Sequence, residues 1–523
     1  MGPEERQMTE GSARHRPATC GRPQPRAGCR LIAALCLLAL ATGVHGASAQ
    51  SAAGDAIPRL LQSGDSAGAL KVIDGRLEQQ PGDARLWTLR GLALTQLQRV
   101  NEALAAYRRA LSLEPAYLPA LQGAAQLEYR RRSPEGQRTL EQILKVDPDN
   151  IVAHAMLGTL AYERQDCTTA LGHFQRADAA IKGNPQALWQ AGHCSFVEER
   201  PADAADKFEQ LLAAGGLDGG LDEVVAFNLA LSLHAAGRHD RAVQRLEPLA
   251  SREPIERDVF ALLADAYAAN QQVEQAVATL RRATILYPRD EQFYVALAAL
   301  CLEHDSFELG REVIEVGLHN VAGSARLYAI RGIIHAQLGA FDQAQADFER
   351  VAQLEPQQPA AIAGLSLTLQ QTGQMEQSIA MLREQARLHP NDPLVNLLFA
   401  QGLLRGEPAA AVLVEARDAL LRAIVVAPRH AVVRSELGKL YLKTGEPENA
   451  LEQLQKAIEL DPSERTATYH LLVALRRAGR DAEAQKLVIR VRELLDEEKA
   501  SEVARNRFRL VKAEPEAERN QPF

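Results

Sequence analysis

A phrase of fifteen residues recurs along the chain at a fixed interval, and this recurrence limits the possible folds more than any other feature. It reads NEALAAYRRALSLEP at 101–115, DQAQADFERVAQLEP at 342–356 and ENALEQLQKAIELDP at 448–462. The prolines that end such phrases are spaced by 34 residues, as between Pro81 and Pro115 or between Pro428 and Pro462. A fixed period of this length is typical of repeat architectures, in which each unit packs mainly against its neighbours.

The composition favours helix throughout the 523 residues. Hydrophobic residues make up 46% of the chain but aromatic residues only 5%, so the apolar content is mostly alanine and leucine. These are good helix formers, whereas the residues that favour strands are sparse. We therefore expect an all-α chain with about 75–85% helix, against about one-third in an ordinary soluble protein.

Particular residues hold fixed places within the period. Glycine or alanine occupies one place in the first predicted helix, and alanine followed four residues later by a large residue occupies the second. This pattern resembles the tetratricopeptide repeat, a pair of antiparallel helices. The residues that carry the resemblance most completely are Trp87, Gly91, Ala103, Tyr107, Ala110 and Pro115.

The resemblance implies a right-handed α-solenoid of about thirteen 34-residue helix-turn-helix repeats, closed by a C-terminal capping helix. Repeats one to five are expected over 50–218 and repeats six to thirteen over 223–496, separated by a glycine-rich loop at 219–222. Whether the glycines at 215–220 form a hinge is left open. The capping helix is expected to end over 497–511, and 512–523 to be a disordered tail.

The N-terminal 49 residues have the features of a signal peptide. An arginine-rich segment precedes an uncharged apolar run at 31–41, and Ala47-Ser-Ala49 has the small residues that a signal peptidase recognises. The run is short for a bilayer span, which needs about 20 apolar residues. We expect cleavage after Ala49 and a periplasmic or secreted protein with no membrane attachment. The alternative is an uncleaved segment that anchors the chain to the inner membrane.

Three cysteines follow the predicted signal peptide: Cys167, Cys194 and Cys301. This low, odd number does not form a disulfide framework. Cys167 and Cys194 fall in adjacent repeats and could pair, but we expect two buried free thiols.

Sequence motifs for catalysis are absent. The chain has no His-Glu-x-x-His, Cys-x-x-Cys, phosphate-binding loop or Gly-x-Ser-x-Gly. The net charge of −8 offers no basic surface for nucleic acid. We therefore predict a protein that is not an enzyme and that has no catalytic residues, no cofactor, no metal site and no nucleic-acid partner.

Function is then expected on the concave surface that the first helices of a solenoid form. In the fifth and sixth repeats this surface is predicted to carry an exposed aromatic cluster, which suggests a binding site for a protein or peptide. The alternative is that the register differs by one and Trp189 belongs to the core. The predicted groove residues are Trp189, His193, Phe196, Phe227, Leu231 and His234.

A basic end of the groove is predicted at Lys439, Lys443, Arg476 and Arg477, which could attract an acidic segment of a partner. The leading hypothesis is a non-catalytic scaffold or assembly factor that binds a peptide or partner protein. The alternatives are a carrier of a small apolar ligand or lipid, and the non-catalytic arm of an enzyme complex. The sequence does not predict the oligomeric state.

Overall fold

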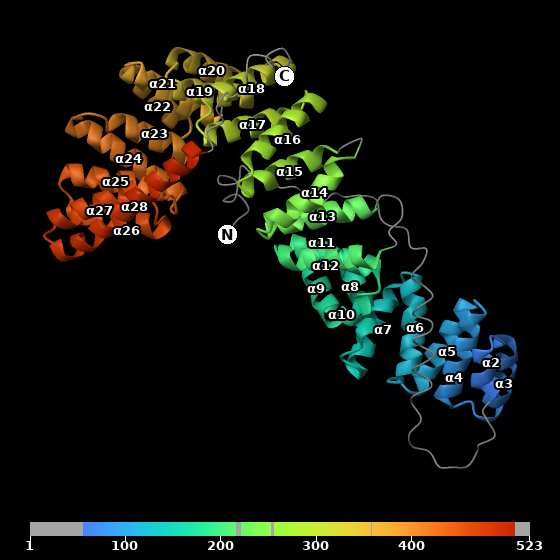
Figure 1. Cartoon of the computed structure of the whole chain (residues 1–523). Helices are drawn as coiled ribbons and strands as arrows, with labels where there is room; N and C mark the ends of the chain where they lie inside the picture. Colours follow the sequence, from blue (N-terminus) through green and yellow to red (C-terminus); the bar gives the residue numbers. More distant parts are fainter. Residues whose placement is uncertain (1–55, 216–220, 253–255, 357, 508–523) are drawn as a thin grey trace. The chain divides into compact units, whose positions relative to one another are not determined.

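The computed structural model describes residues 56–215, 221–252, 256–356 and 358–507. Within these ranges 81% of the residues are helical and no strand occurs (Figure 1). This confirms the prediction of an all-α fold. The predicted signal peptide, the glycine-rich loop at 219–222 apart from its last two residues, and the tail at 512–523 lie outside the described residues.

The described helices form thirteen consecutive pairs, which confirms the predicted number of repeats. The first helices of the pairs are α2 (Ala56–Gln62), α4 (Ala84–Gln96), α6 (Leu118–Arg130), α8 (Ile151–Glu163), α11 (Pro185–Val197), α13 (Leu221–Ala235), α15 (Arg257–Ala269), α17 (Glu291–Glu303), α19 (Ala325–Gln337), α21 (Pro359–Gln371), α23 (Pro393–Leu403), α25 (Ala431–Thr444) and α27 (Arg465–Arg477).

Within each compact unit, the second helices pack against the first helix of their own pair and against that of the next pair. They are α3 (Ser66–Gln79), α5 (Val100–Leu113), α7 (Pro134–Val146), α9 (Cys167–Arg176) with its short continuation α10 (Asp178–Ile181), α12 (Pro201–Ala214), α14 (His239–Ala250), α16 (Val273–Leu286), α18 (Phe307–Asn320), α20 (Phe341–Leu354), α22 (Met375–Leu388), α24 (Ala410–Val426), α26 (Pro447–Leu460) and α28 (Asp481–Arg507).

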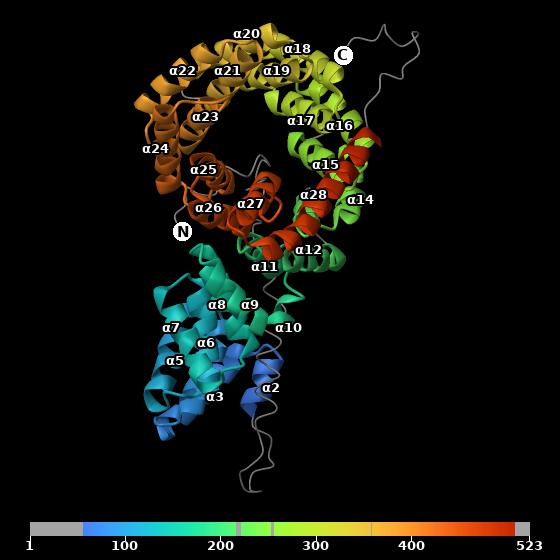
Figure 2. The same ribbon diagram turned by 90° about the vertical axis from the view of Figure 1, so that its left-hand side faces the viewer.

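The chain divides into two compact units, with the boundary between Asn270 and Gln271. Unit 1 ends with α15 and unit 2 begins with α16, so the boundary falls inside the seventh helix pair. In unit 2, the first helices α19, α21, α23, α25 and α27 lie along the inner side of a curve, and the second helices lie outside it (Figure 2).

The turn between the two helices of a pair uses a left-handed backbone conformation in every repeat. Glycine supplies it in seven pairs, for example Gly373 at φ +82°, and a non-glycine residue in six, for example Gln98 at φ +59°. Glycine adopts positive φ without steric cost, whereas other residues pay about 1–2 kcal/mol. Six turns therefore store local strain that the helix packing holds in place.

Large side chains of the second helices fill the space that the glycines leave. A Cβ added to Gly91 would come within 2.6 Å of the Tyr107 ring, and one added to Gly123 within 2.4 Å of the same ring. The Phe348 ring lies in the same way between Gly332 and Gly364. The glycines thus make room for a ring rather than for a close approach of two backbones, and one ring contacts two successive repeats.

The predicted alanine places of the second helices are buried. Ala103, Ala276, Ala344, Ala416 and Ala450 are all fully inaccessible to solvent. The two departures that the sequence shows are also buried in their helices, namely Gly310 in α18 and Ser378 in α22. These burial values confirm the predicted alanine register.

The eleventh pair contains four residues more than the 34-residue period. Its first helix α23 is short, six residues separate it from α24, and α24 has 17 residues where most second helices have 14. The extra length therefore enters both the turn near Arg405 and the second helix. No described helix is long and apolar enough to cross a membrane.

Candidate functional site

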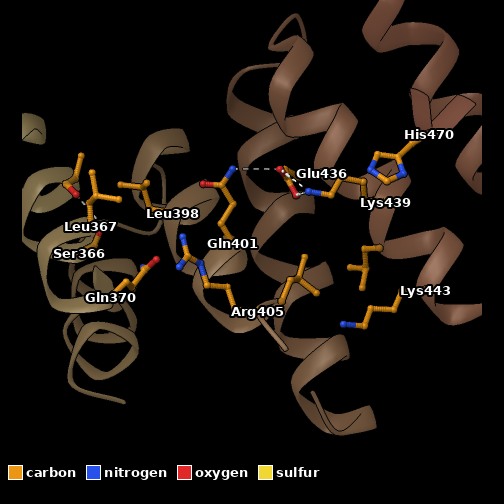
Figure 3. A pocket seen from close by; sticks show the side chains of 13 residues that line it. Ser366, Leu367, Gln370, Leu398, Gln401, Arg405, Glu436, Lys439, Lys443 and His470 are labelled. Atoms are coloured by element: carbon orange, nitrogen blue, oxygen red, sulfur yellow. Dashed lines mark hydrogen bonds and ion pairs between the residues drawn. The ribbon is translucent and has the colours of Figure 1, made fainter. Parts of the chain in front are cut away.

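A pocket of about 670 Å³ lies along the first helices α21, α23, α25 and α27 of unit 2 (Figure 3). Leucines form its apolar lining, and amides, a hydroxyl, an imidazole and charged groups form its polar lining. We call it the basic pocket; it is lined by Ala363, Ser366, Leu367, Gln370, Leu398, Gln401, Leu404, Arg405, Glu436, Lys439, Leu440, Lys443 and His470.

The centre of the basic pocket holds a buried carboxylate. The Glu436 side chain is 10% exposed and forms an ion pair with Lys439, whose Nζ lies 2.9 Å from Glu436 Oε2. Gln401 donates from Nε2 to Glu436 Oε1 over 3.2 Å, and Figure 3 shows the three side chains linked in a row. A buried carboxylate needs such partners, because an unpaired one would be costly. The charge of Lys439 is therefore largely compensated within the site.

Two further cations of the pocket have no carboxylate partner among the described contacts. Lys443 donates from Nζ to the carbonyl oxygen of Gly406 over 2.7 Å. A carbonyl group carries no formal charge, so the positive charge of Lys443 is not neutralised. Arg405 is exposed and lines the same pocket. Three cations against one carboxylate give the pocket an excess of positive charge, in a chain whose net charge is −8. The pocket can therefore attract an anionic group.

The polar groups of the pocket also include a neutral imidazole. Burial, followed by the positive charge of Lys439, lowers the pKa of His470. At neutral pH the ring therefore offers one donor and one acceptor rather than a third free charge. Gln370 and Gln401 add amide donors and acceptors. Amides of this kind can bind the backbone of an extended peptide.

The structure brings some of the predicted basic residues together and separates others. Lys439 and Lys443 line the pocket, as the sequence analysis proposed for a basic end. Arg477 instead donates to the carbonyl oxygen of Leu442 over 2.6 Å, and neither Arg477 nor Arg476 lines the pocket. Sequence reasoning missed six polar lining residues: Ser366, Gln370, Gln401, Arg405, Glu436 and His470. A signal for one was present, since Arg405, with the four inserted residues allowed for, is equivalent to Lys443.

The predicted aromatic cluster of unit 1 is more buried than the sequence suggested. Phe227 is 8% exposed and Leu231 is 5% exposed, so both belong to the core of α13. The prediction that these two side chains face solvent is therefore wrong. The reason is that α13 is buried on most of its circumference, by α12 on one side and α14 on the other.

The other members of the cluster are partly buried. Trp189 packs against Phe208 of α12, with ring centroids 5.5 Å apart, which is a contact between the two helices of one pair. The His193 ring meets Tyr162 edge to face at 5.6 Å. His234 lies beside His239, with their Nδ1 atoms 3.2 Å apart. Phe196 keeps part of its surface accessible. No contiguous exposed aromatic surface therefore exists at these described positions.

A disulfide joins α9 to α11. Cys167 and Cys194 are bonded, with Cα atoms 5.0 Å apart and a separation of 27 residues. The preference for two free thiols was therefore wrong for this pair, whereas Cys301 is free and buried. The pairing arises because the second helix of the fourth repeat packs directly against the first helix of the fifth.

Comparison with known families assigns the repeats. The sequence profile of the cytochrome c-type biogenesis protein H TPR domain matches residues 72–188. Two tetratricopeptide-repeat profiles match 233–330 and 335–402, and 435–488. The chain belongs to the tetratricopeptide-repeat family. The helix pairs described above are thus tetratricopeptide repeats, and such repeats are protein-interaction scaffolds.

One curated relative is similar to part of the chain. It is the cytochrome c-type biogenesis protein CycH of Pseudomonas aeruginosa, which is 26% identical over 218 residues. The match covers 38% of this chain and 52% of the relative, so the chain spans about half the length of the curated relative it matches.

Solved structures with similarity over most of the chain have low sequence identity. Yeast Tom70 is 15% identical with a TM-score of 0.41, and the match covers 80% of this chain and 96% of Tom70. The Cut9–Hcn1 structure is 14% identical with a TM-score of 0.35, and the match covers 80% and 89%.

Proposed function

We propose that this tetratricopeptide-repeat protein is a non-catalytic scaffold that binds an extended segment of a partner protein in the basic pocket of unit 2. The observation that carries the proposal is the combination of an apolar lining, peptide-like amide groups and excess positive charge at one place on the first helices. A segment with acidic residues beside apolar ones would match this lining.

The chemistry of the pocket favours a peptide over the other candidates. A carrier of a lipid or small apolar ligand needs a mostly apolar cavity with few polar groups, whereas charged or amide side chains provide about half of the residues of this lining. An enzymatic role would need a nucleophile or acid–base pair, and the one carboxylate in the pocket, Glu436, is already paired with Lys439.

The similarity to a cytochrome c-type biogenesis protein supports the assignment of the chain to a cellular pathway. We propose that the chain acts in the biogenesis of c-type cytochromes, as an assembly factor exported by the segment before Gln50. The matched profile at 72–188 and the relative's name support this assignment.

Deletion of the gene and complementation tests both parts of the proposal. Deletion should lower the amount of c-type cytochromes with covalently attached haem, measured by haem staining of envelope proteins. The wild-type chain should restore them, and the double variant Arg405→Gln, Lys443→Gln should not. The matched control is Lys456→Gln, which removes an exposed lysine of the second helix α26 that pairs with Glu452.

Two outcomes would contradict different parts. Normal cytochrome levels in the deletion strain would exclude the pathway. Full complementation by the double variant would exclude the basic pocket as the site. The binding step itself is testable with an acidic synthetic peptide: the double variant should bind it at least tenfold more weakly, about 1.4 kcal/mol, and the difference should shrink as salt is added.

A further inference from the structure

Three potential metal ligands meet where the fourth repeat joins the fifth. Cys167 is the first residue of α9, and His193 and Cys194 are neighbours in α11. Their candidate ligand atoms, the two sulfurs and a ring nitrogen of His193, all lie within 4.8 Å of one another. This cluster lies in unit 1 and has no part in the basic pocket, so the inference does not depend on the proposed function.

The His193 ring has an unmet bonding requirement. Its Nδ1 atom is buried and has no hydrogen-bond partner among the described residues. Burial lowers the pKa of His193, which favours the neutral ring that can offer a lone pair to a metal ion. The edge-to-face contact with Tyr162 holds the ring in place. A buried nitrogen without a partner is costly, and an ion coordinated by Nδ1 would satisfy it.

The disulfide must open before the sulfurs can act as ligands. A dithiol reductant can open it by two thiol–disulfide exchanges, in which the reductant becomes a disulfide and Cys167 and Cys194 become thiols. Each thiol then loses its proton as its sulfur bonds to the metal ion.

We propose that Cys167, His193 and Cys194 form a redox-controlled metal site, which binds one thiophilic metal ion in the dithiol state. The site releases the ion when a carrier in its disulfide form oxidises the two cysteines back to the disulfide and is itself reduced to a dithiol. Two thiolates and one imidazole are ligands preferred by Zn²⁺ and Cu⁺. For Zn²⁺ the set leaves a fourth position open, and for Cu⁺ it is complete as a trigonal site. A metal site was not predicted from the sequence because these three residues form no recognised motif.

The test compares the oxidised and the reduced chain. All proteins carry Cys20→Ser, Cys29→Ser and Cys36→Ser, so that the N-terminal cysteines cannot bind the probe. The chain is reduced with a phosphine, freed of reductant without oxygen, and titrated with Co²⁺, with Zn²⁺ as competitor, and separately with Cu⁺ against a chromogenic chelator. We expect one ion per reduced chain and none per oxidised chain.

The spectrum of the Co²⁺ form reports on the ligands. Thiolate-to-cobalt charge-transfer bands should appear in the reduced parent and disappear in Cys194→Ser. His193→Ala should weaken binding at least tenfold, as loss of an interaction with the metal ion typically does. His319→Ala, an exposed histidine of α18, is the matched control and should bind like the parent. Circular dichroism of each variant verifies that it is folded.

The Co²⁺ and Cu⁺ titrations distinguish a zinc site from a copper site, and they can also refute the proposal. Tetrahedral Co²⁺ bands that Zn²⁺ abolishes identify a zinc-type site, and stoichiometric Cu⁺ binding without these bands identifies a copper-type site. A reduced parent that binds neither ion refutes the proposal. Equal binding by the oxidised chain, or unchanged binding by His193→Ala, refutes it as well.

Discussion

The disulfide between Cys167 and Cys194 should be a local clamp with a measurable free energy. It closes a segment with a separation of 27 residues, which includes α10 and links two repeats. In the chain-entropy treatment, a closed loop of about 27 residues removes about 12 cal/mol/K from the unfolded state, which corresponds to about 3.6 kcal/mol at 25 °C. This value is a ceiling, since residual structure in the unfolded chain lowers it.

Reduction of the parent chain is the cleanest perturbation, because it deletes no side chain from the core. The chelator EDTA keeps metal ions from binding to the freed thiols. Unfolding of a long repeat array is not two-state, so the measurement must be local. Native-state hydrogen exchange should show that the opening free energy of amides in α8–α12 falls by about 2–4 kcal/mol on reduction. Amides of α19–α27 should be unchanged.

Cys301→Ser provides the control for this experiment. Cys301 is a free, buried cysteine, so a reductant has no disulfide to open at this residue. Burial also raises the pKa of its thiol to about 12, which keeps it protonated. The shift in α8–α12 should be the same in this variant as in the parent. A shift below about 0.5 kcal/mol, or two free thiols at Cys167 and Cys194 in the exported protein by mass spectrometry, would show that no disulfide clamps these two repeats.

Five further substitutions test the packing and the turns. Phe227→Ala should lower the free energy of unfolding by about 3–5 kcal/mol, because it leaves a cavity in the core. Trp189→Ala should lower it by only about 2 kcal/mol, because Trp189 is partly buried. Equal melting temperatures for wild type and Phe227→Ala would contradict the burial of the Phe227 ring. Ala450→Leu should cost about 1–3 kcal/mol by overpacking one helix crossing, seen as a lower denaturation midpoint. Gln98→Gly should stabilise the chain by about 0.5–1 kcal/mol and Gly373→Ala should destabilise it, since both turns have positive φ; thermal melts showing the reverse order would disprove the strain.

The helix pairs were predictable because each pair has the same packing requirements. A residue that must be small where a large side chain packs, such as Gly91, or small in the second helix, such as Ala450, recurs at the same place in most copies. Thirteen copies make the pattern visible despite individual departures such as Gly310. Periodicity of this kind depends only on local packing, and it therefore appears directly in the sequence.

The orientation of α13 was not predictable for the opposite reason. Its buried residues include eight of the nine between Val225 and Leu233, and they lie on all sides of the helix. Without a polar face, the sequence gives no sign of which side faces solvent, and Phe227 and Leu231 were placed on the wrong one. Trp189 shows the same difficulty on a smaller scale, because the ring packs on Phe208 and still reaches the surface.

The candidate sites depend on contacts between repeats, which the sequence of one repeat does not contain. The sequence predicted Lys439 and Lys443 in a basic cluster, and the partner of Lys439, Glu436, lies three residues earlier in the same helix. The approach of Gln401 and Arg405 instead follows from the position of α23 beside α25 and from the enlarged eleventh repeat. The disulfide is similar. Its cysteines are 27 residues apart in different helices, and their proximity follows from the contact of α9 with α11.

The ring of Phe348, held between Gly332 and Gly364, has a consequence for how such a chain can be rearranged. The 34-residue repeat, as the sequence pattern delimits it, ends at a proline. A boundary for repeat exchange at Pro356 would nevertheless leave the Phe348 ring in one segment and Gly364 in the other. Tyr107 and Gly123 would be parted in the same way by a cut at Pro115. A repeat exchanged at either of these two junctions therefore keeps the packing of its ring only where the incoming first helix also has a glycine at that place.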